Sequence, residues 1–265
     1  MTVCQNCETA FKGKYCSECG QKAGVKRITW RSIFSDLVKK VTFWDKGLLF
    51  TTLHVLKHPG KMARDYIAGK RVNYNKPLNY ILLVVAASVL VFPKKEFENA
   101  LSSINDKSRP NSSVMEWVFS NISIIYLMLI PFLAMVSKWF NRKTDVNFPE
   151  LFVFYCYLMA GSTLVSIPFT VIGNIFHLDA ISASPLGIIQ YSAWILFFAW
   201  GYVQFFGKQR SYWGGIQGAF VLLISYFLYI IIFSILFAIV IVAAKFLLGI
   251  ELITLPKPNT VSPTQ

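Results

Sequence analysis

Charged side chains are scarce in this 265-residue chain, and their absence is concentrated in a few long segments. Only 15% of the residues are charged, whereas an ordinary soluble domain carries roughly 25%. Asp, Glu, Lys and Arg are missing from 110 residues in five segments, which are 77–92, 117–137, 151–176, 186–206 and 219–244. This distribution excludes a soluble globular enzyme, a disordered tail protein and a secreted disulfide scaffold.

The lengths of the uncharged segments predict the fold class. A helix needs about 20 residues to cross a hydrocarbon core of ~30 Å, and four of the five segments reach that length. Segment 77–92 is short unless Tyr74 and Asn75 extend it or the bilayer thins around it. The sequence predicts an all-α polytopic membrane protein with five transmembrane helices over residues 77–250 and a flexible tail over 251–265.

Basic residues are distributed unevenly between the two sides that five crossings define. Of the 26 Lys and Arg residues, 20 lie on the side of the N-terminus and six on the other. The positive-inside rule predicts a cytoplasmic N-terminus and an external C-terminus in a bacterial inner membrane. Because residues 1–30 lack the apolar core of a signal peptide, the first crossing is expected to act as an uncleaved signal anchor.

Four of the five cysteines form two C-x₂-C knuckles near the N-terminus, at Cys4 and Cys7 and at Cys16 and Cys19. Four thiolates complete a tetrahedral zinc site and leave no open position for catalysis, so residues 1–27 are predicted to be a structural zinc ribbon. Two disulfides or a rubredoxin-like iron site are the alternatives. Phe11 and Tyr15 alternate with Lys12 and Lys14 around Gly13, which predicts a small β-hairpin. Cys156 lies in an apolar segment and is interpreted as an inert thiol.

Residues 28–76 predict amphipathic helices between the ribbon and the membrane. Apolar residues recur with helical spacing over 31–44 and again over 48–56. Pro59 suits the start of a third helix, which Gly69 can end. Basic and aromatic side chains then precede the first crossing, and we call this group the basic platform: Lys61, Arg64, Lys70, Arg71, Tyr74 and Lys76.

The basic platform has two interpretations. It could dock anionic lipid headgroups or a partner protein, because juxtamembrane basic residues contribute ~1 kcal/mol each near an anionic leaflet. It could instead be an orientation signal, with helices that only cover the mouth of the bundle. Tyr74 and Tyr80 are predicted to be interfacial aromatic anchors.

The predicted crossings contain only weakly polar candidates for a transport path, which is usually marked by intramembrane charges. A path should bring together Asn121, Ser162, Asn174 and Gln190, whereas an adaptor should have a dry bundle. Gly161 and Gly201 predict close helix packing. Gly214, Gly215 and Gly218 predict a tight cytoplasmic turn before the last crossing.

The order of the N-terminal motifs resembles a known family. The ribbon ends in Cys-Gly-Gln, Pro59-Gly60 follows, and residues 66–71 read Tyr-Ile-Ala-Gly-Lys-Arg before Tyr74-Asn-Lys-Pro77. This order resembles the bacterial zinc-ribbon membrane proteins catalogued as domain of unknown function 3667. The resemblance covers roughly residues 4–90 and implies no catalytic residues, because the family's activity is unassigned. The five-crossing architecture is more loosely similar to Yip-type membrane proteins.

No nucleophile elbow, P-loop, paired-carboxylate motif or dinucleotide fingerprint appears, so no enzyme is expected. The leading hypothesis is an integral inner-membrane protein whose zinc ribbon and basic platform bind a protein partner or anionic lipid in the cytoplasm. The alternatives are a transporter or lipid translocase with the ribbon as regulatory module, and then a membrane enzyme acting on lipid. No nucleic acid is expected as a partner, and an oligomer is possible.

Overall fold

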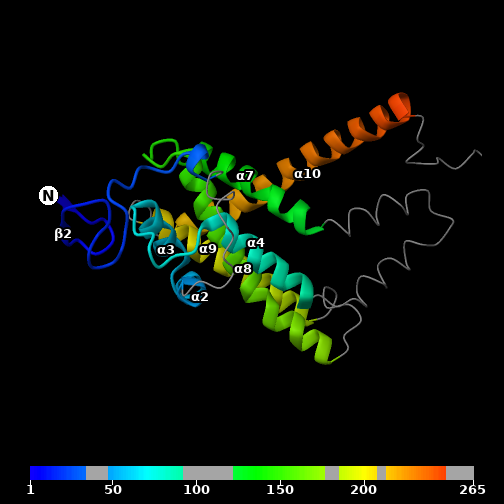
Figure 1. Ribbon diagram of the computed structural model, residues 1–265. Helices are drawn as coiled ribbons and strands as arrows, with labels where there is room; N and C mark the ends of the chain where they lie inside the picture. The colour runs from blue at the N-terminus through cyan, green and yellow to red at the C-terminus, as the bar shows by residue number, and fades with distance from the viewer. Residues whose placement is uncertain (34–46, 92–121, 177–184, 208–212, 249–265) are drawn as a thin grey trace, which may run out of the picture.

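Helices make up most of the protein in the computed structural model, which describes residues 1–33, 47–91, 122–176, 185–207 and 213–248 (Figure 1). The mainly helical fold is therefore confirmed. Two short strands lie in the N-terminal ribbon, β1 (Thr2–Val3) and β2 (Ala10–Phe11). The helices are α2 (Gly47–Lys57), α3 (Pro59–Ile67), α4 (Pro77–Val91), α7 (Ile122–Phe140), α8 (Phe148–Ile175), α9 (Pro185–Phe206) and α10 (Trp213–Leu248).

Helix α8 is the centre of the molecule. Its 28 residues extend about 42 Å, and it packs against α4, α7 and α9 as well as against α2 and α3. The side chains from Val153 to Ser162 are all buried. A helix that is apolar on every side requires such an environment. The other helices are therefore arranged around α8.

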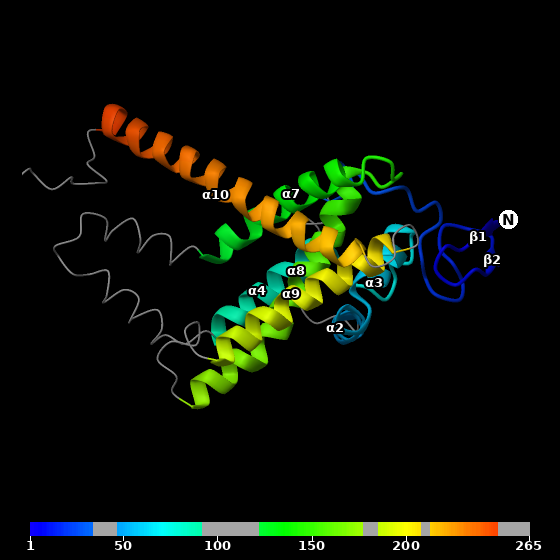
Figure 2. The same cartoon turned by 180° about the vertical axis from the view of Figure 1, so that it is seen from behind.

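Three helices in the described part of the chain are long and apolar enough to cross a membrane. They are Phe148–Ile175, Pro185–Phe206 and Trp213–Leu236. The apolar helices Pro77–Val91 and Tyr126–Phe140 are shorter. These lengths indicate a membrane protein, while five crossings remain a prediction. Figure 2 shows α7 and α10 side by side, diverging from α4, α8 and α9 away from the ribbon.

Glycines bring the helices close together at the two predicted positions. A Cβ atom on Gly201 would lie 2.4 Å from Leu158 Cδ1, and one on Gly161 would lie 2.6 Å from Val55 Cγ1. Both distances are too short for any side chain. The prediction of close packing at these glycines is confirmed.

The predicted turn at Gly214 and Gly215 is wrong. Helix α10 begins at Trp213, so both glycines lie in its first turn. One turn further on, a Cβ on Gly218 would come within 3.0 Å of Tyr202, so this glycine allows a close approach to α9. Gly costs about 1 kcal/mol relative to Ala inside a helix, and the packing against α9 offsets that cost.

Tyr80 is not the interfacial anchor that was predicted. Its side chain is fully buried, and its hydroxyl donates a hydrogen bond of 3.1 Å to the hydroxyl of Thr52 on α2. Tyr80 also packs against Tyr157 of α8, with ring centres 6.0 Å apart. A sequence pattern within α4 could not indicate these distant partners. Of the predicted helix 31–44, residues 31–33 are helical and the rest lies outside the described residues.

Candidate metal centre and the surface beneath it

The four knuckle cysteines meet at one point. Their sulfur atoms all lie within 4.8 Å of one another. Cys4 Sγ is 3.5 Å from Cys19 Sγ, and Cys7 Sγ is 3.5 Å from Cys16 Sγ. Each of these contacts therefore joins one knuckle to the other.

This donor set fits a tetrahedral metal ion. Zinc–sulfur bonds of ~2.3 Å place the corners of an ideal tetrahedron about 3.8 Å apart, within the observed range. All four cysteines are free of disulfides. Hydrogen bonding to Thr9 lowers the pKa of Cys7 to about 6, whereas burial and the three neighbouring cysteines raise the pKa of Cys19 to about 11. The four cysteines could hold one ion, and an S₄ set suits zinc or iron.

The two knuckles have the same backbone hydrogen bonds. Cys4 N donates to Thr9 O and Cys16 N donates to Gln21 O, each five residues ahead. Glu8 N and Gly20 N donate back to the first cysteine of their own knuckle. The two halves of the site therefore repeat one conformation.

Glu8 and Gly20 occupy equivalent positions in that repeat. Both have a positive φ, 62° at Glu8 and 73° at Gly20. Glycine adopts this left-handed conformation without a steric penalty, whereas a residue with a Cβ is strained there. The first knuckle therefore carries a strain that the second lacks.

The strand pairing in the ribbon corrects the predicted hairpin. Thr2 pairs with Phe11, and Tyr15 forms an isolated bridge with Lys22. Phe11 therefore pairs across the first knuckle and Tyr15 across the second. Residues 11–15 do not pair with one another as the predicted hairpin requires. Each knuckle is closed by pairing of the chain segments before and after it. Gly13, with a φ of 121°, lies between the two knuckles.

The ribbon lies on the turn that follows α3. That turn begins with Gly69, where Gly69 N donates to Tyr66 O and Lys70 N donates to Asp65 O, as in a Schellman motif. The predicted helix end at Gly69 is confirmed. A Cβ there would lie 2.2 Å from Gln5 Oε1 of the first knuckle. Glycine is therefore needed both for the turn and for the contact with the ribbon.

Arg71 is part of the same contact. Its backbone N–H donates to Gln21 Oε1 at 3.2 Å, and its guanidinium donates to Lys26 O and Tyr66 O. The guanidinium carbon also lies 5.3 Å from the centre of the Tyr66 ring. Arg71 was predicted only to face lipid or a partner, but it also links the ribbon to α3.

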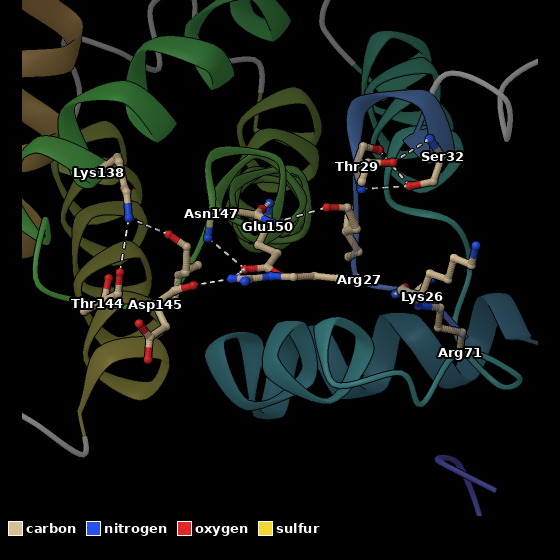
Figure 3. A network of polar contacts seen from close by, with 12 residues as sticks. Lys26, Arg27, Thr29, Ser32, Arg71, Lys138, Thr144, Asp145, Asn147 and Glu150 are labelled. Atoms are coloured by element: carbon tan, nitrogen blue, oxygen red, sulfur yellow. Dashed lines mark hydrogen bonds and ion pairs between the residues drawn. The ribbon is translucent and has the colours of Figure 1, made fainter. Parts of the chain in front are cut away.

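A second connection runs from residues 27–30, which we call the strap, to the start of α8 (Figure 3). Arg27 donates two hydrogen bonds to the carboxylate of Glu150, of 2.6 and 3.0 Å, and a third to Asp145 O. The Glu150 carboxylate raises the pKa of Arg27. Glu150 is only 3% exposed, so its charge needs a partner of this kind.

Asn147 joins the strap to the helix cap. Its side chain and that of Glu150 form a reciprocal capping box at the start of α8. Its amide also donates to Ile28 O at 3.3 Å. Trp30 packs against Phe148 with ring centres 5.5 Å apart. The sequence analysis missed this site, although Asn147-Phe-Pro-Glu150 just before an apolar segment is a recognisable helix start.

The residues of the basic platform are dispersed in the structure. Lys61 is exposed, whereas the others are partly buried. Lys70 Nζ lies 3.6 Å from Asp65 Oδ1, which offsets part of its charge. Tyr74 packs against Phe50, with ring centres 5.4 Å apart. These residues therefore do not form one uniform basic face.

Arg71 and Lys76 do come together, at a small pocket of about 20 Å³ between the strap and the first turn of α4. The other residues that line it are Ile28, Ser32, Ile33, Tyr66, Pro77, Leu78, Asn79 and Val153. First-turn N–H groups of a helix have no acceptor within the helix and attract negative charge. Two cations and this helix start therefore make the surroundings of the pocket electropositive.

Comparison with known proteins supports the resemblance that the motifs indicated. Residues 45–89 match the family described as Protein of unknown function (DUF3667). The match extends from just before α2 to near the end of α4. It therefore includes the basic platform and the part of the pocket between Tyr66 and Asn79, and it excludes the strap, Val153 and the ribbon cysteines. No curated protein and no solved structure matches the chain.

Proposed function

We propose that this is a bacterial inner-membrane protein whose zinc ribbon and basic platform form a cytoplasmic surface for anionic phospholipid headgroups. The pocket between Arg71 and Lys76 carries the proposal, because it gathers two cations beside the start of α4. A phosphate group is attracted to such a site by the positive charge of the two side chains and of the helix start. The five-crossing topology with an external C-terminus is part of the same proposal.

The position of the ribbon supports this role. Gln21 and Lys26 of the ribbon bind Arg71, and the strap borders the pocket through Ile28. A metal held by the ribbon would therefore stabilise one wall of the pocket without touching the ligand. This gives the metal a structural function and needs no catalytic one.

The observed contacts of the polar candidates favour the headgroup surface over a transport path. Ser162 donates to Leu158 O of its own helix, and Asn174 donates to Val91 O of α4. These two residues are about 18 Å apart along α8, so they do not converge on one cavity. Gln190 lies on α9, and Asn121 lies outside the described residues.

The test uses the full chain, because α2 and α3 pack on α8 and α9. Native mass spectrometry of the protein in detergent counts bound phosphatidylglycerol and, separately, neutral phosphatidylcholine. Wild type should bind the anionic lipid more strongly, and added salt should weaken that preference. A variant with Lys61→Gln and Lys76→Gln should lose most of it. Arg71 is left intact because it also holds the ribbon.

The matched control removes the same charge from the ribbon, through Lys12→Gln and Lys14→Gln. It should keep the preference for the anionic lipid, and both variants should keep their metal. Equal binding of the two lipids to wild type at low salt contradicts the proposal. Selective binding of an acidic protein in place of lipid would assign the surface to a protein partner.

A further inference from the structure

Helix α2 has an unusual distribution of side chains. Leucines point away from the protein, with Leu49 73%, Leu53 50% and Leu56 36% exposed. The side that faces the other helices carries Thr51 and Thr52 together with the fully buried Val55. In water, the outward face of a surface helix is polar. The outward face of α2 is apolar instead.

The polar groups of this inner face have partners within the protein. Thr51 Oγ1 donates to Gly47 O and accepts from Asn75 N, and Thr52 accepts from Tyr80. His54 Nδ1 lies 2.9 Å from Phe50 O. Buried polar groups need such partners in any protein. These contacts therefore allow α2 to pack its threonines inward and leave its leucines on the outside.

The axis of α2 is roughly perpendicular to the axes of α4, α8 and α9. Figures 1 and 2 show α2 nearly end-on, whereas α4, α8 and α9 run lengthwise. A helix perpendicular to membrane-spanning helices lies parallel to the membrane plane. With 11 residues, α2 extends about 17 Å, too short to cross a bilayer in any orientation.

The contacts of α2 also give its depth. Val55 lies against Gly161, which is about 21 Å from the end of α8 at Ile175. Thr52 bonds to Tyr80, which is about 17 Å from the end of α4 at Val91. Half of a ~30 Å hydrocarbon core is about 15 Å. If the ends of α4 and α8 far from the ribbon mark one edge of the hydrocarbon core, the contacts of α2 lie more than half of the core thickness from that edge. Helix α2 is then in the leaflet nearer the ribbon.

We propose that α2 is a half-inserted helix, embedded in the ribbon-side leaflet without crossing it, and that lipid acyl chains cover Leu49, Leu53 and Leu56. Lys57 and His58, which follow these leucines, are exposed. A cation at the end of an interfacial helix extends toward the headgroups. This inference rests on the membrane location in the proposed function, but it depends on apolar contact and not on anionic headgroups, so it can be tested apart from headgroup binding.

Site-specific photo-crosslinking tests the insertion in the full chain. p-Benzoylphenylalanine replaces Leu53 in protein reconstituted into neutral phosphatidylcholine nanodiscs, and intact mass after irradiation detects lipid adducts. Ile235 of α10, 54% exposed within a candidate span, gives the reference yield for a lipid-facing position. Lys12 of the ribbon, which is exposed, gives the background.

The yield of lipid adduct at Leu53 should be within about threefold of that at Ile235 and at least tenfold above that at Lys12. The same result is expected at Leu49, which provides a second position if the first variant is unstable. A yield at the Lys12 level, or adducts only within the chain or between two copies, overturns the proposal. Since neutral lipid is used, this outcome is separate from any loss of anionic-lipid preference.

Discussion

Arg27 and Glu150 are 123 residues apart in the sequence and form a bidentate ion pair in the structure. One belongs to the strap after the ribbon, and the other is the N3 residue of α8. The pair therefore connects the metal-binding end of the chain directly to its central helix. A ribbon joined only through its linker would have no such contact.

Substituting Arg27 should release the strap. In Arg27→Lys the two parallel hydrogen bonds to Glu150 cannot both form, because lysine has no planar fork. Arg27→Gln also removes the charge. Hydrogen exchange of residues 27–33 should increase in the order wild type, Lys, Gln. The control Lys26→Gln keeps the contact between Arg71 and the backbone oxygen of residue 26, so it should not change the exchange. Equal exchange in wild type and all three variants would contradict the role of the Arg27–Glu150 pair.

Metal content should be one ion per chain and should depend on the four knuckle cysteines. Cys16→Ser removes a ligand from the S₄ set and should abolish binding, while Cys156→Ala should retain the ion. Elemental analysis of protein purified without chelator measures both. Insertion into the membrane should persist in Cys16→Ser, because it depends on the apolar helices. A metal-free wild type would be incompatible with the site.

Glu8 and Gly20 allow a matched pair of substitutions. Gly20→Ala places a Cβ at a φ of 73° in open space, so its cost is backbone strain of about 1 kcal/mol. Because metal binding and folding of the ribbon are coupled, this cost should lower metal affinity about fivefold. Glu8→Gly relieves strain at the equivalent position and should raise affinity slightly. Competition with a chromogenic chelator measures both affinities. Higher affinity in Gly20→Ala together with lower affinity in Glu8→Gly would refute the equivalence of the two knuckles.

Gly201 and Gly214 should respond differently to the same change. Ala at Gly201 would place its Cβ against Leu158 and Pro59 and force α9 away from α3 and α8. Thermal unfolding in detergent should show a clear loss of stability. Ala at Gly214 meets Val203 at an ordinary 3.4 Å, so it should be neutral or stabilising by up to about 1 kcal/mol. Similar effects at both positions would contradict the packing.

Local sequence patterns predicted the features that depend on neighbouring residues. The spacing of Cys4, Cys7, Cys16 and Cys19 indicated one site, and Pro59 and Gly69 indicated the start and end of a helix. Each knuckle and each helix end depends on the conformation of only a few consecutive residues. The charge-free segments indicated apolar helices for the same reason.

Features that depend on distant residues were not accessible in this way. Tyr80 has the residue type and sequence position of an interfacial anchor, but Thr52 of α2 and Tyr157 of α8 lie against it. Arg27 could be counted among the basic residues of the ribbon, but nothing near it in the sequence identifies Glu150 as its partner. The exposed leucines of α2 follow a helical period, and only the neighbouring helices show which side of α2 faces outward.

The length of α8 determines how far the ribbon can extend. Glu150 is about 38 Å along α8 from Ile175, whereas the hydrocarbon core is ~30 Å thick. In the proposed membrane orientation, the strap therefore lies roughly one headgroup thickness beyond the acyl chains. A lipid headgroup would reach the surface beside it by two-dimensional diffusion within its own leaflet.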